Sequence, residues 1–444
     1  MHKDYFEKVK IKLDNISDSF CAAKWLQTTI HLHNGTTHSC HHNPVHKINI
    51  DQLKNNKTVL HNTDQKKNDR QMMLNGQRPS DCSYCWQIED TDANIFSDRI
   101  YKSASFWARD LIDTISSLPY DYDINPSYME VSFNNTCNFK CSYCSPIFSS
   151  LWLEEIQNFG SYPTSTKFNN LESMKFKLPI LNKEENVYVE KFWEWWPELY
   201  KSLRVFRITG GEPLLNKNTF KILDYIIDNP NPELSIAVNT NLNPPSDIFE
   251  KFTAKLNLIT EKKLVKNLGI YTSAEGHSRC AEYSRFGMNY NKWLENLNYI
   301  LGHINGVHCT IMSTYNIFSL TSYNQFMADM IAARANILKS NTNSTLLVDI
   351  PYLNHPKHLS VLTLDDKEKY FIQNTLDYMK QNGCVPSEIE KMNRIVQLTK
   401  VARANPVDQY DFVKFVDEYD RRRNTNFLET FSELSDMYYR WKKL

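Results

Sequence analysis

The sequence predicts an α/β protein, built as a partial (β/α)6 barrel with a small cysteine-rich module before it and a helical segment after it. From Tyr128 onward, short apolar strands alternate with longer amphipathic stretches, a pattern typical of βαβ units. Seven of the ten cysteines lie before residue 145, and after Leu364 the pattern is helical. Because 444 residues exceed one ordinary core, we expect two structural units, a small module at 1–120 and a barrel at 121–360. The helical pattern adds a C-terminal segment at 361–444.

The N-terminal part begins with a predicted β-hairpin. Residues 25–33 alternate loosely between apolar and polar, Asn34-Gly35 is a strong two-residue turn signal, and residues 36–40 supply the returning strand. The polar run 55–70 then predicts a solvated loop. This loop leads into a short helix that Gly76 ends.

Six strand-and-helix repeats follow, which favour a partial barrel over a closed eightfold one. The predicted strands are residues 129–133, 203–209, 234–239, 268–273, 308–313 and 346–351. The predicted helices include residues 219–227, 248–265, 290–301 and 320–333. A last amphipathic helix is predicted over residues 427–441.

The composition narrows the partners and the compartment. Lys plus Arg and Asp plus Glu both number 51, so no global field draws the chain to nucleic acid or to an anionic membrane. No stretch approaches the ~18 apolar residues of a membrane span, and the first residues lack the apolar part of an export signal. We expect a cytoplasmic protein, in which closely spaced cysteines are more often metal ligands than disulfides.

Three cysteines follow the first predicted barrel strand with the spacing C-x3-C-x2-C: Cys137, Cys141 and Cys144. One loop can turn three such thiolates toward a common metal or cluster. The lack of a nearby fourth cysteine argues against a structural zinc site, which usually has four protein ligands. An iron atom left open in this way can bind and reduce a substrate or cofactor.

A second motif, Gly210-Gly211-Glu212-Pro213, follows the second predicted strand. The two motifs in this order resemble the radical S-adenosylmethionine (SAM) superfamily. The resemblance implies a [4Fe–4S] cluster on the three cysteines, whose open iron binds SAM. It also implies reductive cleavage of SAM to a 5′-deoxyadenosyl radical, which abstracts hydrogen from a substrate.

The resemblance extends to further cofactor-binding residues. Gly210 and Gly211 are expected to let the strand approach the methionine end of SAM, because a Cβ atom would obstruct it. Glu212 and Pro213 complete that motif. Tyr143 resembles the family's aromatic residue beside the adenine, although simple loop packing also explains an aromatic there.

Later strand ends supply the remaining expected SAM contacts. Asn239 or Asn241 is expected to bond the polar groups of SAM, and the sequence does not choose between them. Ser273 resembles a ribose-binding serine. Arg285 resembles a carboxylate-binding arginine, since guanidinium pairs with carboxylate through two parallel hydrogen bonds; a salt bridge is the plain alternative.

Four cysteines of the N-terminal part also have a spacing suited to one site: Cys21, Cys40, Cys82 and Cys85. They resemble the twitch or SPASM-like modules of radical SAM enzymes, which implies an auxiliary [4Fe–4S] cluster, here before the barrel instead of after it. A structural zinc site and unligated thiols are the alternatives. His38, His41 and His42 beside Cys40 leave imidazole ligation open as well.

The resulting functional hypothesis is a radical SAM enzyme that acts on a peptide or protein side chain. It implies an electron donor such as flavodoxin or ferredoxin. Modification of a small molecule or a tRNA base is the alternative within enzymes, and a zinc-stabilised, non-catalytic interaction protein is the alternative of another class. Cys384 is a catalytic candidate, as a hydrogen-atom donor to a substrate radical; an ordinary buried or helix-end cysteine is the simpler interpretation.

Overall fold

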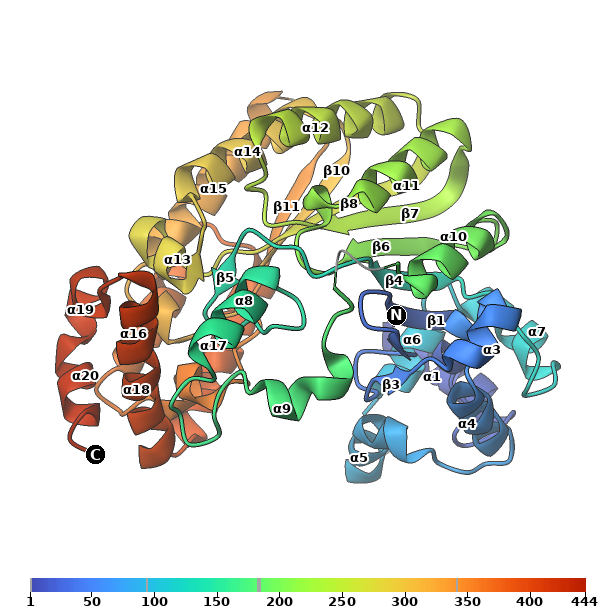
Figure 1. Ribbon diagram of the computed structural model, residues 1–444, viewed down its shortest axis with the longest axis horizontal. Helices are drawn as coiled ribbons and strands as arrows, with labels where there is room; N and C mark the ends of the chain where they lie inside the picture. The colour runs from blue at the N-terminus through green and yellow to red at the C-terminus, as the bar shows by residue number, and fades with distance from the viewer. Residues whose placement is uncertain (1, 93–94, 182–184, 341) are drawn as a thin grey trace. The chain divides into compact units, whose positions relative to one another are not determined.

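The computed structural model describes residues 2–92, 95–181, 185–340 and 342–444 (Figure 1). The chain forms two compact units, each assembled from several stretches of sequence. Unit 1 contains Met1–Asn134, Pro179–Gly210 and Pro232–Ala237. Unit 2 contains Asn135–Leu178, Gly211–Asn231 and Val238–Leu444. The division near residues 120 and 360 stays a prediction.

All six predicted barrel strands are present, which confirms the α/β class. They are β4 (Tyr128–Ser132), β6 (Val205–Thr209), β7 (Asn231–Asn239), β8 (Val265–Thr272), β10 (Val307–Met312) and β11 (Thr345–Asp349). Alternate residues are buried along β10, where Val307, Cys309 and Ile311 face inward. The sequence indicated these strands through short apolar runs that alternate with longer amphipathic stretches.

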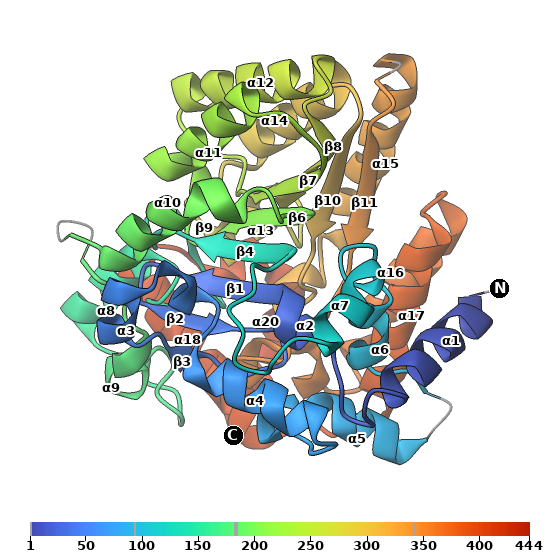
Figure 2. The same ribbon diagram turned by 90° about the vertical axis from the view of Figure 1, so that its right-hand side faces the viewer.

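The predicted hairpin of unit 1 is confirmed. Strand β1 (Gln27–His31) pairs antiparallel with β2 (Thr36–His38), which pairs with the short β3 (His46–Lys47). Gly35, at φ +65°, donates its N–H to the His31 carbonyl at 2.9 Å. The hairpin is not free-standing, because β1 also pairs in parallel with β4, and β4 with β6 (Figure 2).

The polar run 55–70 is not the solvated loop that its composition predicts. It forms η1 (Lys57–Leu60) and the first part of α4 (Asp64–Leu74). Lys66 and Arg70 are only 1% and 0% exposed. The predicted loop was wrong, because composition shows which side chains are polar but not which of them find partners inside the fold. The short helix predicted to end at Gly76 is present as α4, and Gly76 follows it at φ +72°.

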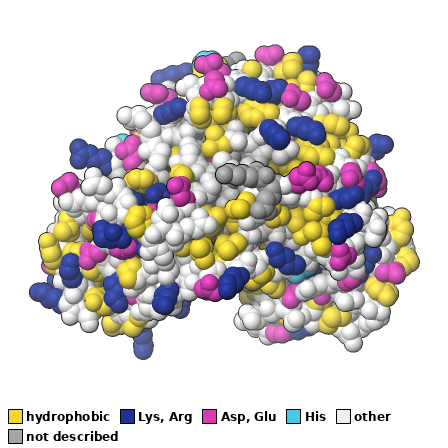
Figure 3. Space-filling model, viewed as in Figure 1, with side chains coloured by type: hydrophobic (Ala, Val, Ile, Leu, Met, Phe, Trp, Pro, Cys, Tyr) yellow, Lys and Arg dark blue, Asp and Glu magenta, His cyan; other side chains and the backbone are white. Residues whose placement is uncertain are grey.

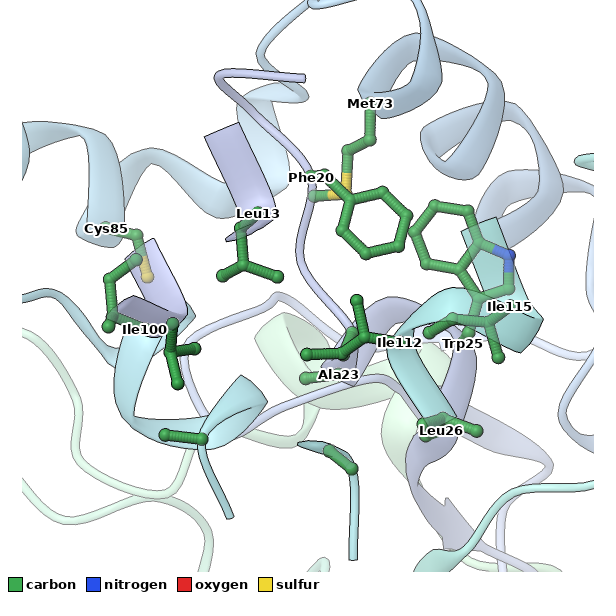
Figure 4. Close-up of a cluster of buried hydrophobic side chains, with 14 of the residues drawn as sticks. Leu13, Phe20, Ala23, Trp25, Leu26, Met73, Cys85, Ile100, Ile112 and Ile115 are labelled. Atoms are coloured by element: carbon green, nitrogen blue, oxygen red, sulfur yellow. The ribbon is translucent and has the colours of Figure 1, made fainter. Parts of the chain in front are cut away.

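The core of unit 1 gathers apolar side chains from several helices (Figure 4). Leu13, Trp25, Met73 and Ile112 come from α1 (His2–Asp14), α2 (Ala23–Leu26), α4 and α7 (Ile112–Ser116). Cys85 belongs to the same cluster, and Cys21 and Cys82 pack against it, so three predicted ligands lie against apolar packing. The other elements of this unit are α3 (Ile50–Asn55), η2 (Ser80–Cys82), α5 (Ser83–Thr91), α6 (Asp98–Ser103), η3 (Arg109–Leu111) and α10 (Val187–Leu199).

Unit 2 contains β8, β10 and β11, which pair in parallel in that order. A separate two-stranded sheet joins β5 (Lys140–Cys141) to β9 (Arg285–Phe286). The α-helices of unit 2 are α8 (Ser150–Phe159), α9 (Leu171–Met174), α11 (Lys217–Asp228), α12 (Ser246–Glu261), α13 (Ser278–Ser284), α14 (Tyr290–His303), α15 (Tyr323–Ser340), α16 (Lys369–Gln381), α17 (Pro386–Val401), α18 (Pro406–Arg423), α19 (Phe427–Thr430) and α20 (Ser435–Trp441). The helix predicted over 248–265 therefore ends four residues early, because Val265 already starts β8.

The last predicted helix, 427–441, is broken into α19, a 3-10 turn and α20. The break falls at Phe431, whose backbone leaves the helical region at φ −126° and ψ 54°. Its ring packs near the rings of Tyr283 and Phe318, with centroids 5.2 and 5.4 Å away. Tertiary packing thus overrides the helical period that the sequence showed.

Charged side chains of both signs are interspersed on the face seen in Figure 3, as the balanced composition leads one to expect. Among the described residues, no helix is at once long and apolar enough to cross a membrane.

Candidate functional site

The loop with Cys137, Cys141 and Cys144 is held by several backbone contacts within unit 2. Cys141 lies on β5 and pairs with Arg285 on β9. The Trp152 indole N–H donates to the Cys141 carbonyl at 2.9 Å, and the Cys144 N–H donates to the same carbonyl at 3.0 Å. The three thiols are therefore carried by one short, tethered segment.

Burial, together with the neighbouring thiols, raises the pKa of Cys137 and of Cys144, the latter to about 12. Burial also raises the pKa of Cys141. These thiols hold their protons at neutral pH, and a bound metal would have to displace them.

No three His, Cys, Asp or Glu side chains in the described ranges converge on a point suited to one metal ion. A four-iron cluster binds each cysteine at a different iron, so its ligands stand farther apart than those of one ion. The spacing C-x3-C-x2-C places the three thiols on one loop, and the group that they bind stays a prediction.

Arg285, Glu275 and Tyr143 form a buried polar group beside these cysteines. Arg285 Nε donates to Glu275 Oε2 at 2.7 Å, and its Nη2 donates to the Tyr143 hydroxyl. Arg285 Nη1 lies 3.5 Å from Cys141 Sγ, and the Ser284 hydroxyl donates to Glu275 Oε1 at 2.6 Å. The salt bridge considered as the alternative for Arg285 exists, but it is buried instead of exposed.

Glu275 is a residue that sequence reasoning missed as part of the site. It is 0% exposed and holds the orientation of Arg285. The sequence did contain a signal for Glu275, which follows the end of β8 and lies two residues after Ser273. A carboxylate so close to a predicted binding serine is a natural partner for an arginine.

A cavity of about 930 Å³ opens beside this group. Its wall includes Tyr143, Cys144, Ser273 and Arg285, so it brings together predicted residues from three separate parts of the sequence. The volume lies at the upper end of the roughly 300–1,000 Å³ usual for small-molecule sites. The cavity is large enough for a cofactor with part of a substrate.

The chain itself leaves no room for a side chain at Gly210 or Gly211. A Cβ on Gly210, which has φ +123°, would lie 2.6 Å from Ser132 Oγ in unit 1. A Cβ on Gly211 would lie 2.3 Å from the Thr136 carbonyl oxygen in unit 2. The obstruction is therefore the chain itself. The approach to SAM stays a prediction.

Glu212 fixes the turn that follows. Its buried carboxylate accepts hydrogen bonds from Leu214 N at 3.0 Å, Thr240 Oγ1 at 2.7 Å and Asn241 N at 2.6 Å. Burial raises its pKa to about 7. Pro213 starts the 3-10 turn that the Glu212 side chain caps.

Of the two predicted asparagines, Asn241 contacts the cysteine loop. Its Nδ2 donates to Asn138 Oδ1 at 2.7 Å, between Cys137 and Cys141 in sequence. Asn239 is the last residue of β7. The structure thus ties Asn241 to the cluster-binding loop, while contact with SAM stays a prediction for both residues.

Cys384 lies between α16 and α17 and is not among the residues that line the 930 Å³ cavity. Burial raises its pKa to about 11. Its position brings no support to the predicted catalytic role.

In unit 1, the four N-terminal cysteines surround a second, much smaller cavity of about 20 Å³. Asn43 links their loops: its Oδ1 lies 3.1 Å from Cys40 Sγ, and its Nδ2 donates to the Asp81 carbonyl at 2.8 Å. Burial, with neighbouring thiols adding to it, raises the pKa of Cys21 to about 12 and that of Cys85 to about 11.

The three histidines beside Cys40 already have partners. His38 Nδ1 lies 2.6 Å from the Cys40 carbonyl, and His41 Nε2 lies 3.8 Å from Glu130. His42 Nε2 lies 2.7 Å from Asp98, and its ring stacks on Tyr84 with centroids 3.6 Å apart. His42 also lines the small cavity, together with the four cysteines.

Comparison with known proteins gives three local matches, each named GTP 3′,8-cyclase; no family model matches. The protein from Sulfurimonas denitrificans is 28% identical over 120 residues, which is 27% of this chain and 29% of its own length. The Pasteurella multocida protein is 31% identical over 114 residues, 26% of each chain. The Syntrophomonas wolfei protein is 29% identical over 139 residues, 31% of this chain and 34% of its own.

The chain spans about a quarter to a third of the length of the curated relatives it matches. The activity of those proteins therefore comes to this chain only as part of the proposal below, and the twitch or SPASM-like subtype stays a prediction.

Proposed function

We propose that the protein is a radical SAM enzyme whose [4Fe–4S] cluster binds Cys137, Cys141 and Cys144. The observation that carries the proposal is the tethered cysteine loop beside a 930 Å³ cavity that Tyr143 and Arg285 also line. When bound, the cluster and SAM supply a 5′-deoxyadenosyl radical. The local matches to GTP 3′,8-cyclases support this class of chemistry.

The chain's own residues bind and orient the reactants. Arg285 is held by Glu275, which leaves its guanidinium fixed in the cavity wall, where it can pair with a ligand carboxylate. Ser273 lines the same cavity, where we expect it to bond a ribose hydroxyl. The Tyr143 ring lies next to the guanidinium, 5.5 Å from ring centroid to Arg285 Cζ. Glu212 and Asn241 connect the neighbouring turn to the cysteine loop, because Glu212 accepts from Asn241 N and the Asn241 side chain donates to Asn138.

Two substrate classes remain in competition. The likeness of the N-terminal cysteines to SPASM-type modules favours a peptide or protein side chain. The names of the relatives favour the second class, a small molecule, since their printed substrate is the nucleotide GTP. The balanced charge, with 51 residues of each sign, favours neither tRNA nor another nucleic acid.

We further propose an auxiliary metal centre on Cys21, Cys40, Cys82 and Cys85. Support comes from their arrangement around one small cavity and from the mutual effect of their thiols on pKa. Four ligands leave no open iron, which suits electron transfer from a substrate radical. An external donor such as flavodoxin or ferredoxin would supply the first electron.

The first experiment measures iron and sulfide after anaerobic reconstitution, in the wild type and in a Cys137/Cys141/Cys144→Ala variant. About eight irons falling to about four indicate two four-iron clusters. About four falling to zero leave the radical SAM site and remove the auxiliary cluster. No bound iron in the wild type would overturn the proposal.

A second experiment follows 5′-deoxyadenosine and product. With GTP or a candidate peptide as substrate and dithionite as reductant, the wild type is expected to couple the two. Replacing Cys82 and Cys85 by Ala should leave 5′-deoxyadenosine formation but remove product. Unchanged product in that variant would show that the auxiliary centre has no part in the reaction.

A further inference from the structure

Arg285 and Cys141 stand directly opposite each other in the two-stranded sheet of β5 and β9. Directly opposite residues of an antiparallel pair project to the same face, with Cβ atoms about 4.5–5.5 Å apart. The backbone register therefore brings a guanidinium next to a thiol. The contact that results joins Arg285 Nη1, as the donor, to Cys141 Sγ at 3.5 Å.

Two neighbouring features fix that register. The Ser142 N–H donates to the Ser284 carbonyl at 2.7 Å, one residue along each strand from the pair. Gly287, at φ +105°, passes so close to the cysteine loop that a Cβ there would lie 2.6 Å from the Asn138 carbonyl oxygen. The approach of β9 to the cysteine loop is thus built into the backbone and does not depend on one side-chain rotamer.

The guanidinium of Arg285 is held on its other sides as well. Its Nε donates to Glu275 at 2.7 Å and its Nη2 to the Tyr143 hydroxyl, and the residue is 7% exposed. Burial lowers the pKa of Arg285, but the Glu275 carboxylate more than offsets this and holds that pKa above its usual range. The group beside Cys141 is therefore a fixed, permanent cation.

The other two thiols of the loop have different neighbours. Cys137 Sγ accepts from the neutral backbone N–H of Phe139 at 3.4 Å. Cys144 Sγ lies 3.9 Å from the Ser145 carbonyl, which is an acceptor. Among the described hydrogen bonds of these three thiols, a cationic donor meets Cys141 alone, so the loop favours negative charge most strongly at that sulfur.

A cationic donor at a ligand sulfur has a directional effect on a bound cluster. Hydrogen bonds to the sulfurs are among the factors that set the potential of an iron–sulfur cluster, and those with a charged partner are the stronger ones. Reduction adds negative charge to the cluster, which a neighbouring cation stabilises. We propose that Arg285 is an N–H···S donor to the cluster ligand Cys141 and raises the reduction potential of the cluster. The inference rests on the cluster proposed above and makes Arg285 a positioning residue that acts through Cys141.

This role is separate from pairing with a carboxylate of SAM. The carboxylate can act on Arg285 only when SAM is bound, whereas the contact with Cys141 exists without any ligand. The midpoint potential of the cluster in the absence of SAM therefore distinguishes the two roles.

The test uses the Cys82/Cys85→Ala background, which removes two ligands of the proposed auxiliary centre so that the iron measured belongs to the cysteine loop of unit 2. Arg285→Met removes the charge and the donors, and Arg285→Gln removes the charge but keeps an amide donor for Glu275. Arg334→Met is the matched control. Arg334 also pairs with a buried glutamate, Glu388, and donates to the Leu346 carbonyl at 3.1 Å, but it does not line the 930 Å³ cavity.

The measurements are iron content and the midpoint potential, each without and with SAM. Both Arg285 variants are expected to have a more negative potential than the parent before SAM is added, whereas Arg334→Met keeps the parent's potential. An Arg285→Met potential equal to that of Arg334→Met without SAM would overturn the inference. A difference that arises only after SAM is added would also overturn it, because Arg285 would then act through the SAM carboxylate.

Iron content separates this inference from the proposed function. A parent that binds about four irons confirms a cluster on the loop, and the potentials then decide the role of Arg285. A parent that binds no iron would remove the proposed cluster, and the inference with it. Should Arg285→Met fail to fold or to bind iron, Arg285→Gln decides by the same comparison, since Glu275 then keeps a hydrogen-bond donor.

Discussion

At the scale of single residues, Gly211 shows that the motif after β6 leaves no room for a side chain. A Cβ there would meet the Thr136 carbonyl oxygen at 2.3 Å, and backbone on both sides leaves little room to move. Gly211→Ala is expected to destabilise the protein by about 1–3 kcal/mol through overpacking and to lower iron bound at the cysteine loop. Urea unfolding and iron analysis measure the two effects.

Gly302→Ala is the matched control for that change. Gly302 lies in α14, and the nearest atom to an added Cβ is Ser340 Oγ at 3.4 Å. Alanine is the better helix former by about 1 kcal/mol, so this variant should be as stable as the wild type or more so. A Gly211→Ala protein with the stability and iron content of Gly302→Ala would contradict the packing argument.

Glu212 gives a prediction about pH. Burial raises its pKa to about 7 from an ordinary 4.5. Between these values the folded protein holds the proton more tightly than the unfolded chain, so wild-type stability falls as pH rises through the window. Glu212→Gln cannot titrate. Its melting temperature minus that of the wild type should therefore increase from pH 4.5 to 7, and a constant difference would refute the shift.

At the scale of elements, α18 holds the cysteine loop through a buried arginine. Arg423 Nη1 donates to the Lys140 carbonyl on β5 at 3.0 Å, and its Nε pairs with Glu155 on α8 at 3.2 Å. Arg423→Met leaves Glu155 with less compensation and should cost about 3 kcal/mol. It should also lower iron retention at the three cysteines beside β5.

Arg421→Met, two residues earlier on α18, is the control. Its side chain is 59% exposed and pairs with Glu418 on the surface, where ion pairs contribute little. Equal stability is expected for Arg421→Met and wild type in urea unfolding. If Arg423→Met behaved the same way, α18 would not be a support of the loop.

The elements also show how far sequence could reach. The six barrel strands were predictable because each contains a short apolar run; burial alternates along β6, β10 and β11, whereas β4 is buried almost throughout. The pairing of β1 with β4 was not, since nothing local in residues 25–40 indicates a strand partner a hundred residues away. The final helix was predicted too long for a related reason: Phe431 breaks it to pack against rings that lie distant in sequence.

The residues of the candidate site also fall into those that the sequence could indicate and those that only the fold reveals. The sequence could single out Cys137, Tyr143, Ser273 and Arg285 because each stands in a recognisable motif or near a strand end, and their roles toward a cofactor stay predictions. The contact of Glu275 with Arg285 could not be predicted, because it depends on burial and on partners brought in by folding. The burial of Lys66 was missed for the same reason, since polar composition alone made it look solvated.

At the scale of the whole molecule, thiols in both units have raised pKa values in the metal-free protein. Burial raises those of Cys21 and Cys144 to about 12 and that of Cys85 to about 11. An unfolded thiol titrates near 8.5. Between about pH 8.5 and 11 the folded, metal-free chain therefore binds more protons than the unfolded chain, and its stability falls as pH rises.

Metal binding should remove this loss of stability at high pH, because ligated thiolates have already given up their protons. The melting temperature of the reconstituted protein minus that of the metal-free protein is thus expected to widen steadily from pH 8 to 10. Buried tyrosines titrate in both forms, so their effect cancels in the difference. The Cys137/Cys141/Cys144→Ala variant, which keeps only the unit 1 thiols, should show a smaller widening. Parallel curves for the loaded and metal-free wild type would mean that these cysteines do not bind the metal.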